Sequence, residues 1–128
     1  MKDTLLIIED NEQNFYMMSF LLQKNGFAVL GAGSGLEGIE MALHHRPAAI
    51  LLDIQLPEMD GYAVAAQLKK HQELAHIPII AVTSYAMSGD RERILAAGAT
   101  GYIEKPINPE TFVMELAQYL KPDSPSRE

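Results

Sequence analysis

The chain has 128 residues, 48% of them hydrophobic, and its 17 acidic and 10 basic residues give a net charge of -7. Its length suits one domain, its excess of acids disfavours a direct grip on nucleic acid phosphates, and its lack of cysteines excludes disulfides and thiol chemistry. No apolar run approaches the roughly 20 residues that span a bilayer, so we expect a cytoplasmic protein without membrane insertion, whose partner is another protein or a cation.

Five short apolar segments predict β-strands. Their approximate ranges are residues 4–9, 27–32, 48–53, 77–83 and 101–105. The third and fourth are apolar on both faces. This favours a parallel sheet covered by helices on each side over an alternating sheet with one face in water.

Segments with helical spacing lie between and after these strands. The residues expected to face the core are Phe15, Met18 and Leu22 in the first helix, Leu36, Ile39 and Leu43 in the second, and Phe112, Leu116 and Leu120 in the last. The third helix is expected over residues 62–71 and the fourth over residues 88–97.

Local signals mark where several helices begin. Ser34 and Glu37 form a capping-box pattern at the second helix, and Asp60 is expected to cap the third. Asn108 followed by Pro109 predicts the start of the last helix, because proline loses nothing at the first helical position.

The fivefold alternation of strand and helix predicts an α/β fold, with a single five-stranded parallel sheet and five helices on both faces. We expect one domain over residues 1–121 and a disordered polar tail over residues 122–128. Such a tail could not fold into an output domain, so we expect the output to be another molecule.

Polar residues stand where the predicted strands end. Glu9 and Asp10 follow the first strand, Asp53 ends the third, Thr83 ends the fourth and Lys105 ends the fifth. The carboxyl ends of parallel strands meet at one edge of the sheet, where open α/β folds bind their ligands. We therefore expect these side chains to gather at a single site.

Three close carboxylates repel one another unless positive charge lies among them. Lys105 and a divalent ion would supply three positive charges against three negative ones. Oxygen ligands indicate a hard ion, and Mg²⁺ (or Mn²⁺) suits few carboxylates and leaves positions open for a phosphoryl oxygen. Beside such an ion, held by Glu9 and Asp10, Asp53 can attack phosphorus to form an acyl phosphate, with Lys105 and Thr83 stabilising the phosphoryl oxygens.

Four motifs stand in the order and spacing of one known family: IEDN at residues 8–11, LDIQLPEMDG at 52–61, VTS at 82–84 and GYIEKP at 101–106. Over roughly residues 5–120 the chain resembles the receiver domain of two-component response regulators. Residues 75–90 look most like stand-alone receivers of the DivK type and the receivers of hybrid histidine kinases. The resemblance implies a CheY-like, flavodoxin-like sheet with strand order 2-1-3-4-5.

The same resemblance implies roles for the strand-end residues. Asp53 would accept a phosphoryl group from the phosphohistidine of a sensor histidine kinase or a histidine phosphotransfer protein. The metal would be bound by Asp10, Asp53 and the backbone carbonyl of Gln55, while Glu9 would act through water. The chain would be a signalling domain that assists only its own phosphorylation and dephosphorylation.

The resemblance also implies a switch. Thr83 and Tyr102 would form the switch pair, and Lys105, followed by a cis bond to Pro106, would pair with the phosphoryl oxygens. A downstream protein would contact the face formed by the fourth helix, fifth strand and fifth helix, with Arg91 or Arg93 as candidate contacts. The domain would act as a monomer or a weak dimer.

Ser84 stands where alanine is frequent in this family, and the resemblance implies that Gln55 and Tyr85 would flank the path of an attacking water. We hypothesise that Tyr85 shields the acyl phosphate.

The alternatives to a stand-alone phosphorylated receiver are an interaction module that is not phosphorylated, a receiver segment of a hybrid kinase, a phosphatase and a flavin carrier. A phosphatase with a strand-end Asp would place it after the first strand, with a second Asp where Gln55 stands. A flavin carrier would need a phosphate-binding loop where residues 9–12 carry three acids.

Overall fold

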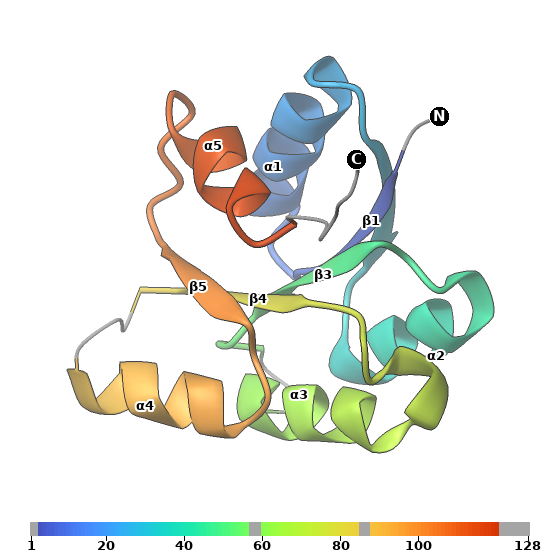
Figure 1. Ribbon diagram of the computed structural model, residues 1–128. Helices are drawn as coiled ribbons and strands as arrows, with labels where there is room; N and C mark the ends of the chain where they lie inside the picture. Colours follow the sequence, from blue (N-terminus) through green and yellow to red (C-terminus); the bar gives the residue numbers. More distant parts are fainter. Residues whose placement is uncertain (1–2, 57–59, 85–87, 121–128) are drawn as a thin grey trace, which may run out of the picture.

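The computed structural model describes residues 3–56, 60–84 and 88–120, which form a five-stranded parallel sheet between two layers of helices (Figure 1). The strand order is β2-β1-β3-β4-β5, so the predicted fold class and strand order are confirmed. The elements in chain order are β1 (Thr4–Ile8), α1 (Glu12–Lys24), β2 (Ala28–Ala32), α2 (Gly35–His45), β3 (Ala49–Asp53), α3 (Gly61–Lys70), the short 3-10 helix η1 (Gln72–Leu74), β4 (Ile79–Thr83), α4 (Ser88–Ala96), β5 (Gly101–Glu104) and α5 (Phe112–Ala117).

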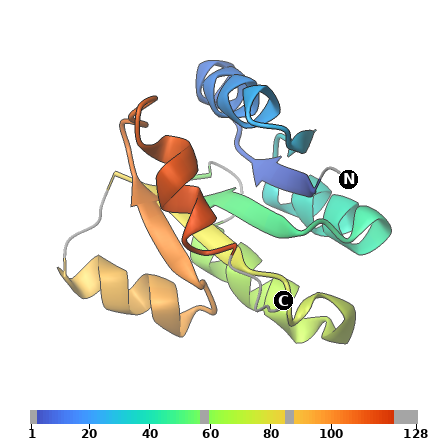
Figure 2. The same cartoon turned by 45° about the horizontal axis from the view of Figure 1, so that its top comes forward.

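The sheet is buried from both sides because its central strands are apolar throughout. All five residues of β3 and all five of β4 are buried. Successive side chains of a strand point to opposite faces, so Ile50 and Leu52 join the core under α2, α3 and α4, whereas Leu51 joins the core under α1 and α5. Figures 1 and 2 show these two helical layers from different sides.

Helix α2 packs on the sheet differently from the sequence prediction. Leu36, predicted to face the core, is 69% exposed, so that prediction was wrong. The helix instead approaches β1 through Gly38, where an added Cβ would lie 2.7 Å from Cγ1 of Ile8. Ile39 and Leu43 do pack against the core, as predicted. A glycine therefore sets the helix rotation that the leucine spacing did not reveal.

The predicted capping pattern of α2 is present. Oγ of Ser34 accepts the N–H of Glu37 at 3.2 Å, and Oε1 of Glu37 accepts the N–H of Gly33 at 3.0 Å. Ser34 thus satisfies a donor of the first helical turn, whereas Glu37 reaches back to Gly33, one residue before the cap, and not to the N–H of Ser34 itself.

Helix α5 begins later than predicted. Asn108 Oδ1 accepts the N–H of Glu110 at 3.0 Å, which forms a tight turn, and the Asn108 carbonyl accepts the N–H of Phe112 at 2.9 Å. The asparagine therefore caps a turn that precedes the helix, and Pro109 lies in this turn. The predicted core residues Phe112 and Leu116 are fully buried.

The predicted tail over residues 122–128 lies outside the described residues. In the part of the chain that the structure describes, no helix is both long and apolar enough to cross a membrane.

Candidate functional site

The polar residues singled out in the sequence converge at the carboxyl edge of the sheet. Glu9 and Asp10 directly follow β1, Asp53 is the last residue of β3, Thr83 is the last residue of β4, and Lys105 directly follows β5. Because β1 pairs with β3 and β3 with β4, the first four residues end three adjacent strands. The parallel topology alone thus brings together residues far apart in sequence.

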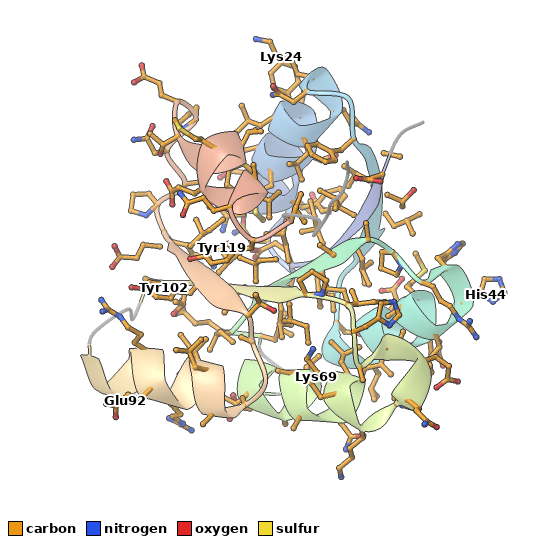
Figure 3. The ribbon with its side chains drawn as sticks, viewed as in Figure 1. Lys24, His44, Lys69, Glu92, Tyr102 and Tyr119 are labelled. Atoms are coloured by element: carbon orange, nitrogen blue, oxygen red, sulfur yellow. The ribbon has the colours of Figure 1, made fainter. Side chains whose placement is uncertain are left out.

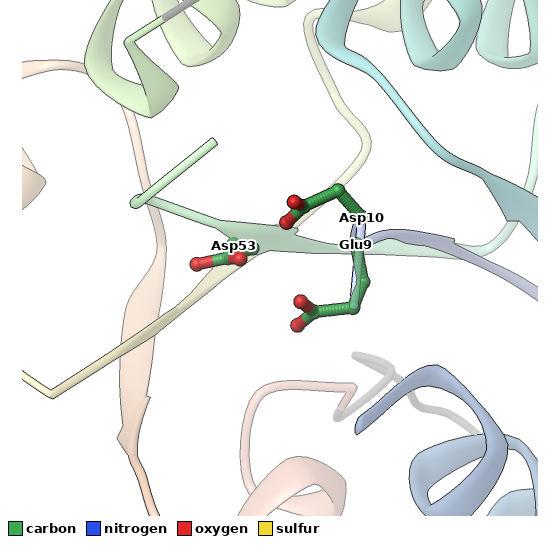
Figure 4. A group of neighbouring side chains, drawn as sticks. All are labelled: Glu9, Asp10 and Asp53. Carbon is green, nitrogen blue, oxygen red and sulfur yellow. The ribbon is translucent and has the colours of Figure 1, made fainter. Parts of the chain in front are cut away.

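Glu9, Asp10 and Asp53, hereafter the acidic cluster, each place a carboxylate oxygen within 4.8 Å of the other two. Figure 4 shows the Glu9 and Asp10 side chains extending from the end of β1 toward the side of Asp53. Asp53 is 2% exposed and Glu9 is 4% exposed, whereas Asp10 lies at the surface. A cavity of about 450 Å³ beside Glu9 and Asp10, also lined by Phe15, opens the cluster on the side of β2.

Lys105 supplies the positive charge next to the acidic cluster. Its Nζ lies 3.2 Å from Oδ1 of Asp53 and 3.8 Å from Oε1 of Glu9. The peptide bond between Lys105 and Pro106 is cis. With its side chain only 18% exposed, the lysine is a partly buried cation shared by two buried acids.

One oxygen of Asp53 is held by two donors. Oδ1 accepts the N–H of Gln55 at 2.9 Å as well as the Nζ–H of Lys105 at 3.2 Å. These bonds fix the side-chain rotamer from two directions. Oδ2 is consequently the oxygen best placed to bind a cation or to attack an electrophile.

Glu9 is the most electrostatically perturbed acid of the site. Burial, followed by the negative charge of Asp53, raises the pKa of Glu9 to about 7, against smaller opposing effects of Lys105 and of the N–H of Asn11. Among the described residues, Oε1 of Glu9 is the one buried side-chain polar atom without a hydrogen-bond partner. The charge of Asp53 thus outweighs that of Lys105 at Glu9, so a further positive charge near Oε1 would favour the ionised form.

A hard divalent cation fits this donor set. The acidic cluster offers carboxylate oxygens alone, which Mg²⁺ and Mn²⁺ prefer. Fully ionised, its three negative charges exceed the single charge of Lys105 by two. A dication would cancel this excess and give Oε1 of Glu9, which accepts no hydrogen bond, a second counter-charge beside Lys105.

The loops after β3 and β4 are joined beside Asp53 by a pair of hydrogen bonds. The N–H of Ser84 donates to Oε1 of Gln55 at 3.2 Å, and its hydroxyl donates to the same atom at 2.8 Å. The sequence identified both residues as neighbours of the site but did not predict their contact. The hypothesis that Tyr85 shields the site concerns a residue outside the described ranges.

The two residues of the expected switch pair differ in their surroundings. Thr83 is fully buried, whereas Tyr102 on β5 is half-buried, and the guanidinium of Arg91 lies 5.4 Å from the centre of its ring. The hydroxyl of Tyr119, just beyond α5, donates to the Tyr102 carbonyl at 3.5 Å (Figure 3). Tyr102 therefore lies between α4 and the chain that follows α5.

A second arginine links α4 to α3. The guanidinium of Arg93 lies 4.1 Å from the ring centre of Tyr62 and 4.0 Å from the carboxylate of Asp60. Asp60 also accepts the N–H of Tyr62 at 3.0 Å, which confirms its predicted role as the cap of α3. Both arginines that the sequence marked as candidate partner contacts thus touch tyrosines within the domain.

Comparison with known proteins identifies a matching family and several similar proteins. Residues 5–117 match the family model of the response regulator receiver domain. The polar-differentiation response regulator DivK of Brucella ovis is 44% identical over 120 residues, which cover 94% of this chain and 98% of that protein. The chemotaxis response regulator CheY4 of Vibrio cholerae has a TM-score of 0.89 and 28% identity, covering 93% of this chain and 99% of that one. The receiver domain of sensor histidine kinase PA1611 from Pseudomonas aeruginosa, solved with a magnesium ion coordinated in its active site cleft, has a TM-score of 0.85 and 31% identity, covering 94% and 98%.

Proposed function

The chain belongs to the response regulator receiver domain family, and on this premise we propose that Asp53 is the residue that accepts the phosphoryl group. The observation that carries this proposal is the setting of Asp53, a buried carboxylate inside the acidic cluster with one oxygen fixed by Lys105 and Gln55. No other described aspartate is both buried and part of such a cluster.

The proposal includes a bound Mg²⁺ or Mn²⁺. Asp10, Asp53 and the backbone carbonyl of Gln55 would hold the ion, and Glu9 would act through water. When bound, the ion neutralises the cluster and the charge of the phosphoryl oxygens. The orphaned oxygen and raised pKa of Glu9 support this part of the proposal, as does the ion in the PA1611 receiver.

In the proposed transfer, Oδ2 of Asp53 attacks the phosphorus of a phosphohistidine. The bond between phosphorus and the imidazole nitrogen breaks, and the imidazole keeps the electron pair. Lys105, already 3.2 Å from Oδ1, pairs with a phosphoryl oxygen, and the Thr83 hydroxyl donates to another. Such transfer depends on positioning and charge neutralisation more than on further covalent chemistry, so the domain assists only its own phosphorylation and dephosphorylation.

The partners follow from this chemistry. A sensor histidine kinase or a histidine phosphotransfer protein would donate the phosphoryl group in the cytoplasm, and a downstream protein would contact the face of α4, β5 and α5. Phosphorylation would bias two arrangements of this face that already exchange, through Thr83 and Tyr102. The half-buried position of Tyr102 next to Arg91 supports this coupling.

Acetyl phosphate and intact-mass spectrometry test the proposal. In the presence of Mg²⁺ the protein should gain one phosphoryl mass increment, and Asp53→Asn should gain none. Chelation of the ion should remove the increment from the unmodified protein. An equal increment in Asp53→Asn would place the phosphoacceptor elsewhere, and no increment in either protein would favour an interaction module that is not phosphorylated.

A further inference from the structure

The hydrogen bonds between Gln55 and Ser84 fix which way the Gln55 amide faces. A backbone N–H can only donate, so the amide atom 3.2 Å from the N–H of Ser84 must be the carbonyl oxygen of the side chain. The Ser84 hydroxyl, 2.8 Å from the same oxygen, must then donate as well, because that oxygen has no proton to give. The orientation of the amide is therefore set by chemistry.

These two donors use the acceptor capacity of the Gln55 side chain. A carbonyl oxygen has two lone pairs, and this one already accepts two hydrogen bonds from Ser84. The remaining polar group of the side chain is the amide NH₂, which can donate but cannot accept. A water molecule that attacks phosphorus must give up a proton and is activated by an acceptor, which Gln55 held in this way cannot provide.

The pair lies beside the proposed phosphoacceptor and borders solvent, from which an attacking water must come. Gln55 lies two residues beyond Asp53 and donates its backbone N–H to that carboxylate at 2.9 Å, and Ser84 directly follows Thr83. Gln55 is half-buried and Ser84 is exposed, so their contact lies at the boundary between the buried acid and solvent. The contact also bridges the ends of the adjacent strands β3 and β4.

We propose that Ser84 is a positioning residue that holds the Gln55 side chain in an orientation unable to activate water, and thereby prolongs the acyl phosphate on Asp53. The inference rests on the proposed function, because it presupposes phosphorylation at Asp53. In the hydrolysis concerned, water oxygen bonds to phosphorus and the bond from phosphorus to the Asp53 oxygen breaks. The carboxylate keeps the electron pair, and the water proton leaves with inorganic phosphate or to solvent.

The test compares the decay of the acyl phosphate in four proteins: wild type, Ser84→Ala, Gln55→Ala and the double variant. Each is phosphorylated with acetyl phosphate and Mg²⁺, freed of the donor, and followed by intact mass over time. Ser84→Ala keeps the backbone donor but frees one lone pair of the amide oxygen. Loss of one such hydrogen bond should speed decay by about two- to tenfold. In the Gln55→Ala background the same change should have no effect.

Three further measurements distinguish a positioning role of Ser84 from a general destabilisation of the fold. Ser84→Thr keeps the hydroxyl and should restore the slow decay of the wild type. The rate of phosphorylation and the urea midpoint of Ser84→Ala should match those of the wild type, because Ser84 is exposed.

Four outcomes would overturn the inference. An unchanged or slower decay in Ser84→Ala would remove it. An equal acceleration in the Gln55→Ala background would attribute the effect to easier access of water rather than to the amide. A wild-type protein that gains no phosphoryl increment would remove the proposed function together with the inference, whereas an increment with equal decay in all four proteins would remove the inference alone.

Discussion

Acidification should weaken Mg²⁺ binding, because Glu9 must lose its proton before the acidic cluster carries its full negative charge. Burial, followed by the negative charge of Asp53, raises the pKa of Glu9 from 4.5 to about 7. Protons and the dication therefore compete for the same site. At about pH 6 the neutral form of Glu9 predominates, and at about pH 8 the charged form does.

The pKa of Glu9 determines how strongly the affinity for Mg²⁺ changes with pH. In the limit in which the ion binds only when Glu9 is ionised, a pKa of about 7 multiplies the apparent dissociation constant of Mg²⁺ by roughly 11 at about pH 6 and by roughly 1.1 at about pH 8. The affinity should therefore fall by up to about tenfold between these two conditions, and by less where Glu9 acts through water. Near neutral pH, where Glu9 is half ionised, binding of one ion should release about half a proton.

The raised pKa of Glu9 also determines whether the stability of the metal-free protein rises or falls with pH. Because the pKa of Glu9 is raised in the folded protein, its stabilising contribution is present below the unfolded value of 4.5 and is lost as the pH rises toward about 7. In the presence of a chelator, this group should therefore make the unfolding temperature fall as the pH rises through that interval. Saturating Mg²⁺ should reverse the loss, because the ion binds only the folded site.

Isothermal titration calorimetry measures both the affinity and the number of released protons, the latter from buffers that differ in ionisation enthalpy. Glu9→Gln is the matched control: its amide oxygen can still accept the N–H of Asn11, but it does not titrate. Its affinity should vary much less over the same pH interval. A wild-type dissociation constant that stays constant with pH, or a Glu9→Gln variant with the same slope, would refute the reasoning.

Three further predictions concern Lys105, Asp53 and Gly38. Lys105→Gln should slow phosphorylation by acetyl phosphate about 100-fold, since a preorganised charge at the phosphoryl oxygens is lost; a rate near that of the wild type would contradict this role. Asp53→Asn should raise the unfolding temperature in metal-free buffer, because it removes a buried negative charge from the acidic cluster, and a lower temperature would argue against repulsion there. Gly38→Ala should lower the free energy of unfolding by about 1–3 kcal/mol in urea titrations, because its Cβ would meet Ile8. Gly33→Ala, whose Cβ has only an ordinary contact at 3.8 Å, is the control, and equal losses in both variants would contradict the packing explanation.

The elements of the fold were predictable because the signals that define them are local. Each strand is a short apolar run, so the number of strands and their positions in the chain required no knowledge of distant contacts, whereas their order in the sheet came from the family resemblance. The gathering of the site residues at the carboxyl edge of the sheet was predictable for a related reason. In a parallel sheet every strand ends on the same side, so Glu9, Asp10, Asp53, Thr83 and Lys105 were brought together by topology alone.

What the sequence did not reveal depends on contacts between distant segments. The rotation of α2 follows from the fit of Gly38 against Ile8, which outweighs the helical spacing of Leu36. The contact between Gln55 and Ser84 joins residues 29 positions apart through side-chain rotamers that no local pattern encodes. Such features are properties of tertiary packing.

A crystal structure of the protein with Mg²⁺ tests the central claim most directly, because that claim makes a bound dication the reason why three acids tolerate one another. The ion should lie about 2.0 to 2.1 Å from oxygens of Asp10 and Asp53 and from the Gln55 carbonyl, with water in the remaining positions. A structure at saturating Mg²⁺ in which Glu9, Asp10 and Asp53 turn away from one another, with no ion between them, would contradict it.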